Sequence, residues 1–331
     1  MKRKLCAILV SDLPPDAPLE DLATLDMARD IANALKRLGY ETRTLPFVSD
    51  LAVNRAQLAD LKPDFVFNLV EAIFGKGALA FIAPALFEDI KIPFVGSGSS
   101  AIFATTDKIL SKQVLKSLNI ATPAWATAPD FSGVDEAKRY IVKNAREDAS
   151  IGIDSDSVVQ TRAAVIARAK RANEERQGEW FAEEYVDGRE FNIAVLDGED
   201  GPEVMPLAEM TFQDYPEDKP KIVDYKAKWN ENTFEYENSC RYFIDESEES
   251  ALAAKLSDTA LKSWRAFGLR GWGRVDMRVN ENGTPLVIDI NANSDLSEGM
   301  GMADAAEKKG ISYDALIARI VDSTLRTSAA T

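Results

Sequence analysis

The first hundred residues alternate between short apolar runs and stripes of apolar residues at helical spacing. Residues 5–10 form a run typical of a buried strand, and apolar side chains then recur every three or four positions up to Leu38, where Gly39 suits a helix end. The alternation continues, and it predicts strands over 41–47, 64–70 and 93–95 and helices over 51–61 and 78–90. Strands separated by helices predict a parallel α/β sheet in this part of the chain.

The rest of the chain mixes helices with extended runs that follow one another directly. The predicted elements are helices over 107–118, 161–176, 247–267 and 313–325 and strands over 139–143, 180–186, 190–196, 203–210, 274–279 and 286–290. Consecutive strands with polar turns between them, such as Asn282-Gly283, favour antiparallel pairing. Residues 216–246 are rich in charged and aromatic side chains without clean periodicity, which predicts a long loop that is functional or disordered.

The composition narrows the class of protein. The 331 residues are 46% hydrophobic and 28% charged, which predicts a soluble globular chain of two or three domains. With 54 acidic and 39 basic residues the net charge is −15, which disfavours nucleic acid as a partner but permits a nucleotide and its metal. Cys6 and Cys240 give neither a disulfide framework nor a zinc-ligand spacing, and no apolar run reaches the roughly 18 residues of a membrane span. We therefore predict a cytoplasmic protein without a membrane partner.

Histidine is absent from the chain, and this restricts the chemistry available to it. Nucleophilic schemes that pair Ser or Cys with His are excluded, as are His-ligated metals and a His general base. Any catalysis must therefore rely on Lys, Arg, Asp, Glu, Tyr or Ser.

The predicted C-terminal hairpin carries a group of polar residues that suits a metal ion beside a phosphate. Arg274 and Asp276 share a face of one strand, and Asp289 and Asn291 share a face of its partner. Three oxygen ligands can thus meet one guanidinium at the same end of the hairpin, and Mg²⁺ prefers oxygen ligands. An ordinary hairpin with exposed polar positions explains this pattern equally well.

Two further segments suit a nucleotide. Lys108 and Lys143 lie at the edges of apolar segments, and the small residues between 149 and 152 would let backbone N–H groups approach a phosphate. Residues 183–190 place carboxylates on either side of an apolar hinge, as adenine and ribose hydroxyls require. Taken alone, solvated surface lysines and a strand-turn-strand with an Asp-Gly turn are the simpler readings.

The order and spacing of these segments resemble the ATP-grasp ligases, in particular the D-alanine:D-alanine ligase branch. The resemblance covers nearly the whole chain, through residues 64–71 (DFVFNLVE), 93–97 (PFVGS), 106–108 (TDK) and 289–291 (DIN). It implies an α/β ATP-grasp fold in which two α+β lobes enclose the nucleotide. The implied domains are a Rossmann-like parallel α/β domain over 1–104, a central lobe over 105–187, and a C-terminal lobe over 188–331 with a closing loop over 216–240.

The resemblance also implies a role for each matching residue. Residues 146–152 resemble the phosphate-covering loop, and the segment around Lys228 resembles the loop that closes near the γ-phosphate. The implied nucleotide ligands are Lys108 and Lys143 at the phosphates, Glu183, Tyr185 and Val186 at adenine, and Glu190 at the ribose. The implied catalytic residues are Arg274, which would stabilise the oxyanion, with Lys228 and Ser150. The implied ligands of two Mg²⁺ ions are Asp276, Asp289 and Asn291.

The part of the pattern that would bind amino acids departs from the family. Glu71-Ala72 stands where the family has His-Gly, and Asp295-Leu296-Ser297 replaces a glycine-containing turn that binds the second substrate. We assign Glu71, Asp295 and Ser297 to the substrates. The acidic pair suggests a substrate that carries an ammonium or another cation, although Glu71 at a helix cap near Ile73 or facing solvent is an equally weighted alternative. Trp229 replaces the closing-loop tyrosine, and Asp289 replaces a longer glutamate.

The sequence therefore predicts an ATP-dependent carboxylate–amine ligase that works through an acyl phosphate. Its cofactors would be ATP and two Mg²⁺ ions, and its partners small molecules: an amino acid or small peptide carboxylate and an amine, not simply two D-alanines. A phosphotransferase on the same scaffold and a non-catalytic nucleotide-binding protein are the alternatives. The resemblance alone implies a homodimer.

Overall fold

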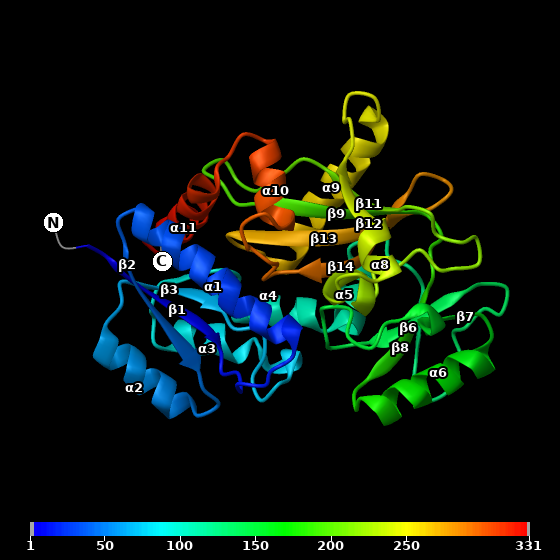
Figure 1. Ribbon diagram of the computed structural model, residues 1–331, viewed down its shortest axis with the longest axis horizontal. Helices are drawn as coiled ribbons and strands as arrows, with labels where there is room; N and C mark the ends of the chain where they lie inside the picture. The colour runs from blue at the N-terminus through cyan, green and yellow to red at the C-terminus, as the bar shows by residue number, and fades with distance from the viewer. Residues whose placement is uncertain (1–2, 330–331) are drawn as a thin grey trace.

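The computed structural model describes residues 3–329, and the chain begins with four parallel strands in the order β2-β1-β3-β4 (Figure 1). The strands are β1 (Leu5–Ser11), β2 (Glu41–Phe47), β3 (Phe65–Leu69) and β4 (Phe94–Val95). All five positions of β3 are buried, as expected of a parallel strand covered on both faces. The accompanying helical segments are α1 (Leu19–Arg37), α2 (Leu51–Leu61), η1 (Gly77–Leu79) and α3 (Ile82–Asp89). The predicted parallel α/β sheet is confirmed.

A smaller antiparallel sheet comes next, in the order β5-β8-β6-β7. Its strands are β5 (Trp125–Thr127), β6 (Tyr140–Asn144), β7 (Val158–Val159) and β8 (Trp180–Glu184), preceded by α4 (Ser99–Thr106) and α5 (Lys108–Ser117) and covered by α6 (Arg162–Glu175). Val165, Ala169 and Ala172 of α6 pack against this sheet in one apolar cluster. The Asp107 carboxylate accepts a hydrogen bond from the Leu110 N–H at 2.9 Å, and this cap begins α5 at Lys108.

The largest sheet runs β12-β11-β9-β13-β14, with β10 paired to β9. Its strands are β9 (Arg189–Leu196), β10 (Glu203–Val204), β11 (Ala208–Phe212), β12 (Ser239–Phe243), β13 (Trp272–Val279) and β14 (Pro285–Asn291). Val275 and Met277 of β13 pack in the core cluster that includes α9 (Ser250–Phe267). Because side chains alternate along a strand, Arg274, Asp276 and Arg278 lie together on the opposite face.

The last two helices return to the beginning of the chain. They are α10 (Gly301–Lys308) and α11 (Tyr313–Ala329), and α11 lies beside α1 (Figure 1). Arg37 binds both carboxylate oxygens of Asp314, with Nε to Oδ1 and Oδ2 at 3.0 and 2.9 Å and Nη2 to Oδ1 at 2.6 Å. One apolar cluster therefore includes residues from both ends of the chain. Within residues 3–329 no helix combines the length and the apolar character that crossing a membrane requires.

The prediction of an unstructured segment over 216–246 is wrong. This segment contains α7 (Tyr225–Trp229), α8 (Phe234–Asn238) and β12. Each short helix begins at a capping side chain, because Asp224 accepts from the Ala227 N–H and Thr233 from the Tyr236 N–H. β12 then adds an antiparallel edge strand to β11. The segment has local structure that a search for long periodic stretches does not detect.

Other differences have local causes. The predicted strand over 203–210 is two strands, β10 and β11, with Pro206 between them, because proline supplies no N–H to a sheet. The predicted helix over 78–90 divides into η1 and α3. Helices α4 and α10 and the short strands β5 and β7 were not predicted. The three sheets use residues 5–95, 125–184 and 189–291, and the predicted domain boundaries after 104 and 187 remain predictions.

Candidate functional site

The candidate metal ligands meet on the face of the large sheet opposite α9. Asp276 Oδ1 accepts from Arg274 Nε at 2.7 Å, and its Oδ2 accepts from Arg274 Nη2 at 2.9 Å and from Asn291 Nδ2 at 3.1 Å. The β13–β14 pairing sets Asp289 opposite Asp276, with a register shift just beyond this pair. A residue that was not predicted, Asn192 of β9, also donates to Asp276 Oδ1, at 2.9 Å. The predicted convergence of these side chains is therefore present.

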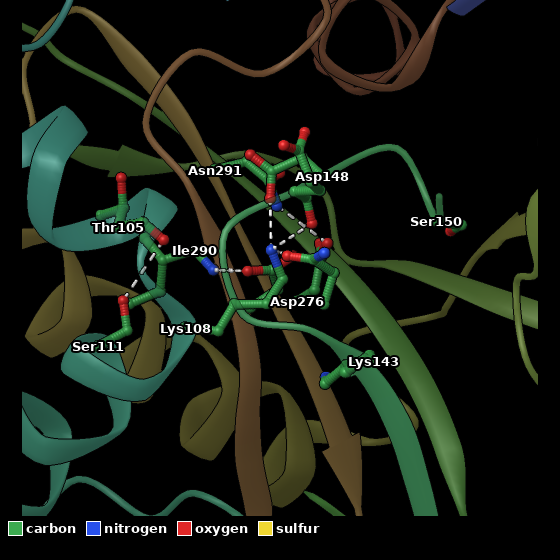
Figure 2. Close-up of polar contacts among 12 residues, drawn as sticks. Thr105, Lys108, Ser111, Lys143, Asp148, Ser150, Asp276, Ile290 and Asn291 are labelled. Carbon is green, nitrogen blue, oxygen red and sulfur yellow. Dashed lines mark hydrogen bonds and ion pairs between the residues drawn. The ribbon is translucent and has the colours of Figure 1, made fainter. Parts of the chain in front are cut away.

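Lys108 joins this hairpin to the phosphate-covering loop (Figure 2). Its Nζ donates to Asp148 Oδ1 at 2.5 Å and to the Glu147 carbonyl at 3.0 Å, and it lies 3.8 Å from Asp289 Oδ2. Burial by itself lowers the pKa of Lys108, but the carboxylates of Asp148 and Asp289 raise it above the ordinary value. The lysine therefore stays charged at neutral pH.

Positive charge is concentrated around Asp289. Burial raises the pKa of this carboxyl, yet the cationic side chains around it bring the pKa below its ordinary value. Those cations are Lys108, Lys143, Arg274 and Lys228. All four were predicted to contact the phosphates or the reacting oxygens, and the fold brings them to one place from four separate segments. Such a group can bind the phosphate chain of a nucleotide.

The predicted adenine ligand Glu183 lies between two lysines. Its Oε1 is 2.6 Å from Lys143 Nζ, and its Oε2 pairs with Lys112 Nζ. Lys112 was not predicted; it is 2% exposed and also donates to Thr122 Oγ1 at 2.8 Å. Burial, with a smaller effect of Lys143, lowers the pKa of Lys112 to about 8, against the opposing effect of Glu183. In this structure Lys143 therefore binds a carboxylate at the place predicted for adenine.

The hinge between the two antiparallel sheets contains the remaining predicted nucleotide residues. The Tyr185 ring is buried, and two guanidinium groups lie over it, those of Arg139 at 4.7 Å and Arg278 at 5.3 Å from its centre. Its hydroxyl accepts from the Lys221 N–H at 3.0 Å. Tyr185 therefore holds the hinge against the following loop, and Val186 beside it is fixed through its carbonyl by Arg278 at 3.1 Å.

The phosphate-covering loop and the closing segment contact each other directly. Ser150 Oγ donates to the Val223 carbonyl at 2.8 Å, and Trp229 Nε1 donates to the Ala149 carbonyl at 3.1 Å. Ala149 and Ser150 both have positive φ, of 58° and 59°. Gly152 also has positive φ, and a Cβ there would lie 2.7 Å from the Trp180 ring, so the loop requires glycine at this position.

Lys228 extends from the closing segment toward the same cations and carboxylates. Desolvation by the surrounding protein and the nearby Arg274 lower the pKa of Lys228, although the residue is exposed to solvent. The opposing effects of Asp276, Asp289 and Asp148 are smaller. The Lys228 amine therefore lies near Arg274, which is 46 residues further along the chain.

Glu71 lies where the first sheet faces this cleft. Its Oε2 accepts from Thr24 Oγ1 at 2.8 Å, and the Ser11 hydroxyl accepts from the backbone N–H of Glu71 and of Ala72. Surrounding protein raises the Glu71 pKa to about 7, with further increases from Asp295, Asp148 and Asp21. No helix begins at Ile73, which instead pairs with Lys76 in a short bridge. The alternative that Glu71 caps a helix is therefore wrong, whereas the alternative that Glu71 faces solvent agrees with its exposed position.

The other two predicted substrate residues form one turn. Asp295 Oδ1 accepts from the Ser297 N–H at 2.8 Å and from Ser297 Oγ at 2.7 Å. Asp295 raises the pKa of Glu71, so the two carboxylates face the same space from different elements. Ser297 therefore orients the Asp295 carboxylate.

The proposed metal ligands were compared with what Mg²⁺ requires. Within residues 3–329 no three His, Cys, Asp or Glu residues form a metal-binding group, and the predicted set consists of two carboxylates and the Asn291 amide. Asp276 and Asp289 are opposed in register, and their hydrogen-bond and ion-pair partners are cations or amide N–H groups. An oxygen-only donor set of this kind fits Mg²⁺.

Three residues of the site were not found from the sequence, and each had a weak signal. Lys112 follows Lys108 by one helical turn, and Asn192 and Arg278 each follow a predicted site residue by two positions on a strand. Those spacings put them on the same face as their neighbours. Applying the periodicity to the site, and not only to the core, would have identified all three.

Sequence comparisons relate this chain to D-alanine--D-alanine ligases. A sequence profile described as D-ala D-ala ligase C-terminus matches residues 131–322. The D-alanine--D-alanine ligase of Chromohalobacter salexigens is 31% identical over 272 residues, covering 81% of this chain and 79% of its own. The D-alanine--D-alanine ligase of Aquifex aeolicus is 28% identical over 303 residues, which cover 90% of this chain and 94% of that protein.

The fold has close relatives among solved structures. The crystal structure of D-alanine--D-alanine ligase from Bacillus anthracis complexed with ATP superposes with a TM-score of 0.76 at 19% identity, covering 100% of this chain and 99% of that one. The ligase from Coxiella burnetii superposes with a TM-score of 0.70 at 16% identity. The predicted ATP-grasp fold class is thereby confirmed.

Proposed function

The chain belongs to the D-alanine–D-alanine ligase family of ATP-dependent carboxylate–amine ligases, and we propose that it joins an amino acid or small peptide to an amine through an acyl phosphate. The substrates of this proposal are not simply two molecules of D-alanine. The observation that carries it is the set of four cations around Asp289, from four separate segments, beside an acidic surface formed by Glu71 and Asp295.

The cationic half of the cleft suits the first step. An oxygen of the substrate carboxylate attacks the γ-phosphorus of ATP, the bond from that phosphorus to the bridging oxygen breaks, and ADP leaves. Lys108, Lys143 and Lys228 offset the charge on the phosphoryl oxygens, which is where fixed cations lower the barrier most. Asp276, Asp289 and Asn291 would hold Mg²⁺, which when bound neutralises charge on the phosphate oxygens.

Arg274 suits the second step. The amine attacks the acyl carbon, the tetrahedral oxyanion collapses, inorganic phosphate leaves, and the amine loses a proton as the amide forms. Burial lowers the Arg274 pKa, but Asp276 raises it above the ordinary value, so the guanidinium stays charged. Its two hydrogen bonds to Asp276 fix its orientation before any substrate binds.

Contacts between the two loops protect the intermediate. The Ser150 and Trp229 side chains join the phosphate-covering loop to the closing segment. Closure of this kind removes water, and an acyl phosphate that meets water is hydrolysed before an amine reaches it. Trp229 covers the site by packing and by its N–H, without a hydroxyl.

The acidic half of the cleft supports the choice of substrate. Glu71 and Asp295, with Asp148 and Asp21 nearby, make the space beside the first sheet negative. A substrate that places an ammonium or another cation there is favoured over one that places a carboxylate there. Thr24 holds one oxygen of Glu71 in position.

The test is mass spectrometry of the protein with ATP, Mg²⁺ and a pooled library of L- and D-amino acids and small amines. We expect ADP, inorganic phosphate and a product equal to two substrates minus water. Lys228→Ala should remove that product, while Lys226→Ala, at the other lysine of the same short helix, should retain it. ADP with a phosphorylated substrate and no condensation would instead identify a phosphotransferase.

A further inference from the structure

Arg278 is a buried cation in the nucleotide half of the site that the proposed chemistry does not use. Its side chain is 4% exposed, and its five N–H groups are directed to three segments. Nε and Nη2 donate to Glu190 Oε2 at 3.1 and 2.5 Å. Nη1 donates to the carbonyls of Val186 and Gly188 at 3.1 and 3.4 Å, and Nη2 also donates to the Lys221 carbonyl. The guanidinium therefore joins the hinge, β9 and the loop that leads to the closing segment.

This arrangement leaves Arg278 without a free donor for a ligand. A guanidinium has five N–H groups, and the hydrogen bonds above account for all of them. Burial lowers the Arg278 pKa, but Glu190 and Tyr185 raise it above the ordinary value, so the group remains charged. Any effect of Arg278 on a nucleotide must therefore pass through the groups that it holds.

Glu190 is the group through which this effect would act. Both hydrogen bonds from Arg278 go to one oxygen, Oε2, and within residues 3–329 no side chain hydrogen-bonds to the other oxygen, Oε1. The carboxylate is 9% exposed, so its rotation is restricted. A carboxylate held in this way presents one acceptor oxygen in a constant direction, as binding of a sugar hydroxyl requires.

We propose that Arg278 is a positioning residue that gives the nucleotide site its selectivity for a ribose hydroxyl. It directs Glu190 Oε1 toward that hydroxyl and, through Val186 and Gly188, holds the hinge in register with it. This inference rests on the proposed function, because it takes the nucleotide to lie at the hinge with its ribose at Glu190. It adds a residue and a specificity that the proposed function does not contain.

The test measures binding and not ligation, so that it is independent of the unidentified amino-acid substrates. Dissociation constants of ATP, 2′-deoxy-ATP and 3′-deoxy-ATP are measured by titration calorimetry with Mg²⁺ for the unchanged protein and for Arg278→Met. We expect the unchanged protein to bind ATP at least about tenfold more tightly than one of the deoxy analogues, because a charged hydrogen bond is lost. The ratio of the dissociation constant of the deoxy analogue to that of ATP measures this preference. In Arg278→Met this ratio should fall toward one, mainly because ATP binds more weakly.

A matched control separates this role from general support of the fold. Arg139→Met removes the other guanidinium that lies over the Tyr185 ring. That group pairs with Asp187 at the surface and forms no ion pair with Glu190. The ratio of the two dissociation constants in Arg139→Met should equal that of the unchanged protein. If Arg278→Met does not fold, Arg278→Lys keeps the charge but not the forked geometry, and its ratio should still fall several-fold.

Two outcomes would overturn the inference. One is an equal loss of affinity for ATP and for both deoxy analogues in the Arg278 variants, which is the behaviour of a merely structural residue. The other is an unchanged protein that binds all three nucleotides alike. A protein that binds no nucleotide would refute the proposed function as well, whereas ATP binding without ligation would refute only the proposed reaction.

Discussion

The Lys112–Glu183–Lys143 cluster allows a quantitative test of how this site is held together. Glu183 is 3% exposed and is the only carboxylate in ion-pair contact with either lysine among the described residues. Glu183→Gln keeps the size of the side chain but leaves two buried ammonium groups without a counter-charge. Breaking a buried ion pair by removing one partner costs about 3–5 kcal/mol.

Lys112 limits that loss because it can release its proton. With Glu183 present the Lys112 pKa is about 8, so deprotonation at pH 7 costs about 1.4 kcal/mol, and it costs less once Glu183, which raises this pKa, is replaced. We therefore expect a loss near the lower end, about 3 kcal/mol, and a melting temperature lower by roughly 4 °C, because the unfolding entropy of 331 residues is about 0.7 kcal/mol/K. Lys112→Met should lose less than about 1 kcal/mol, because it leaves Glu183 paired with Lys143 and substitutes an apolar chain of similar length.

Differential scanning calorimetry of the unchanged protein and both variants measures these shifts, and a pH series gives an independent check. Because folding lowers the Lys112 pKa from 10.5 to about 8, the unfolded chain binds more protons on this residue between those values. The contribution of Lys112 to the free energy of unfolding should therefore rise as the pH increases from about 8 to 10.5. This rise should be absent from Lys112→Met. If Glu183→Gln were as stable as the unchanged protein while Lys112→Met lost several kcal/mol, the reasoning would be refuted.

Three further substitutions test other parts of the site. Arg274→Ala should lower kcat about 10²- to 10³-fold in steady-state kinetics and leave the dissociation constant of ATP, measured by calorimetry, nearly unchanged. An unchanged kcat would show that Arg274 has no role in the reaction. Glu71 has a pKa of about 7, so kcat/KM for a substrate with an ammonium group should rise as pH passes from 6 to 8, and Glu71→Gln should flatten this profile. Gly152→Ala, at a φ of 72° and with its Cβ 2.7 Å from Trp180, should weaken ATP binding several-fold in a titration, while equal affinity would show that the loop adapts.

Much of the fold could be predicted because its signals are local. The apolar runs of β1 and β3 and the helical stripe of α1 are each contained within fewer than twenty consecutive residues. The segment over 216–246 was misjudged because its two five-residue helices are too short to show a helical period. Their capping residues, Asp224 and Thr233, were the signals present in the sequence.

The candidate site was only partly predictable. Strand alternation is enough to put Arg274 with Asp276 and Asp289 with Asn291, and the assignment of Lys108 and Lys143 to the nucleotide, which came from the resemblance to known ligases, stays a prediction. Lys112 was missed because a lysine on an amphipathic helix is usually solvated, and only the position of Glu183 across the small sheet makes it buried. The assignment of Tyr185 to adenine stays a prediction. The structure adds the neighbours of this residue, Arg139 and Arg278.

By itself the sequence determined most of the longer helices and strands, the alternation of faces along them and the list of charged residues available for chemistry. Only the tertiary structure decided which charges meet. Asn192 and Asp276 are 84 residues apart, and Glu190 and Arg278 are 88 apart, yet both pairs are neighbours through the β9–β13 register. Side-chain periodicity is a property of a few consecutive residues, whereas strand register depends on the packing of the whole sheet, and the electrostatics of the cleft follow from that register.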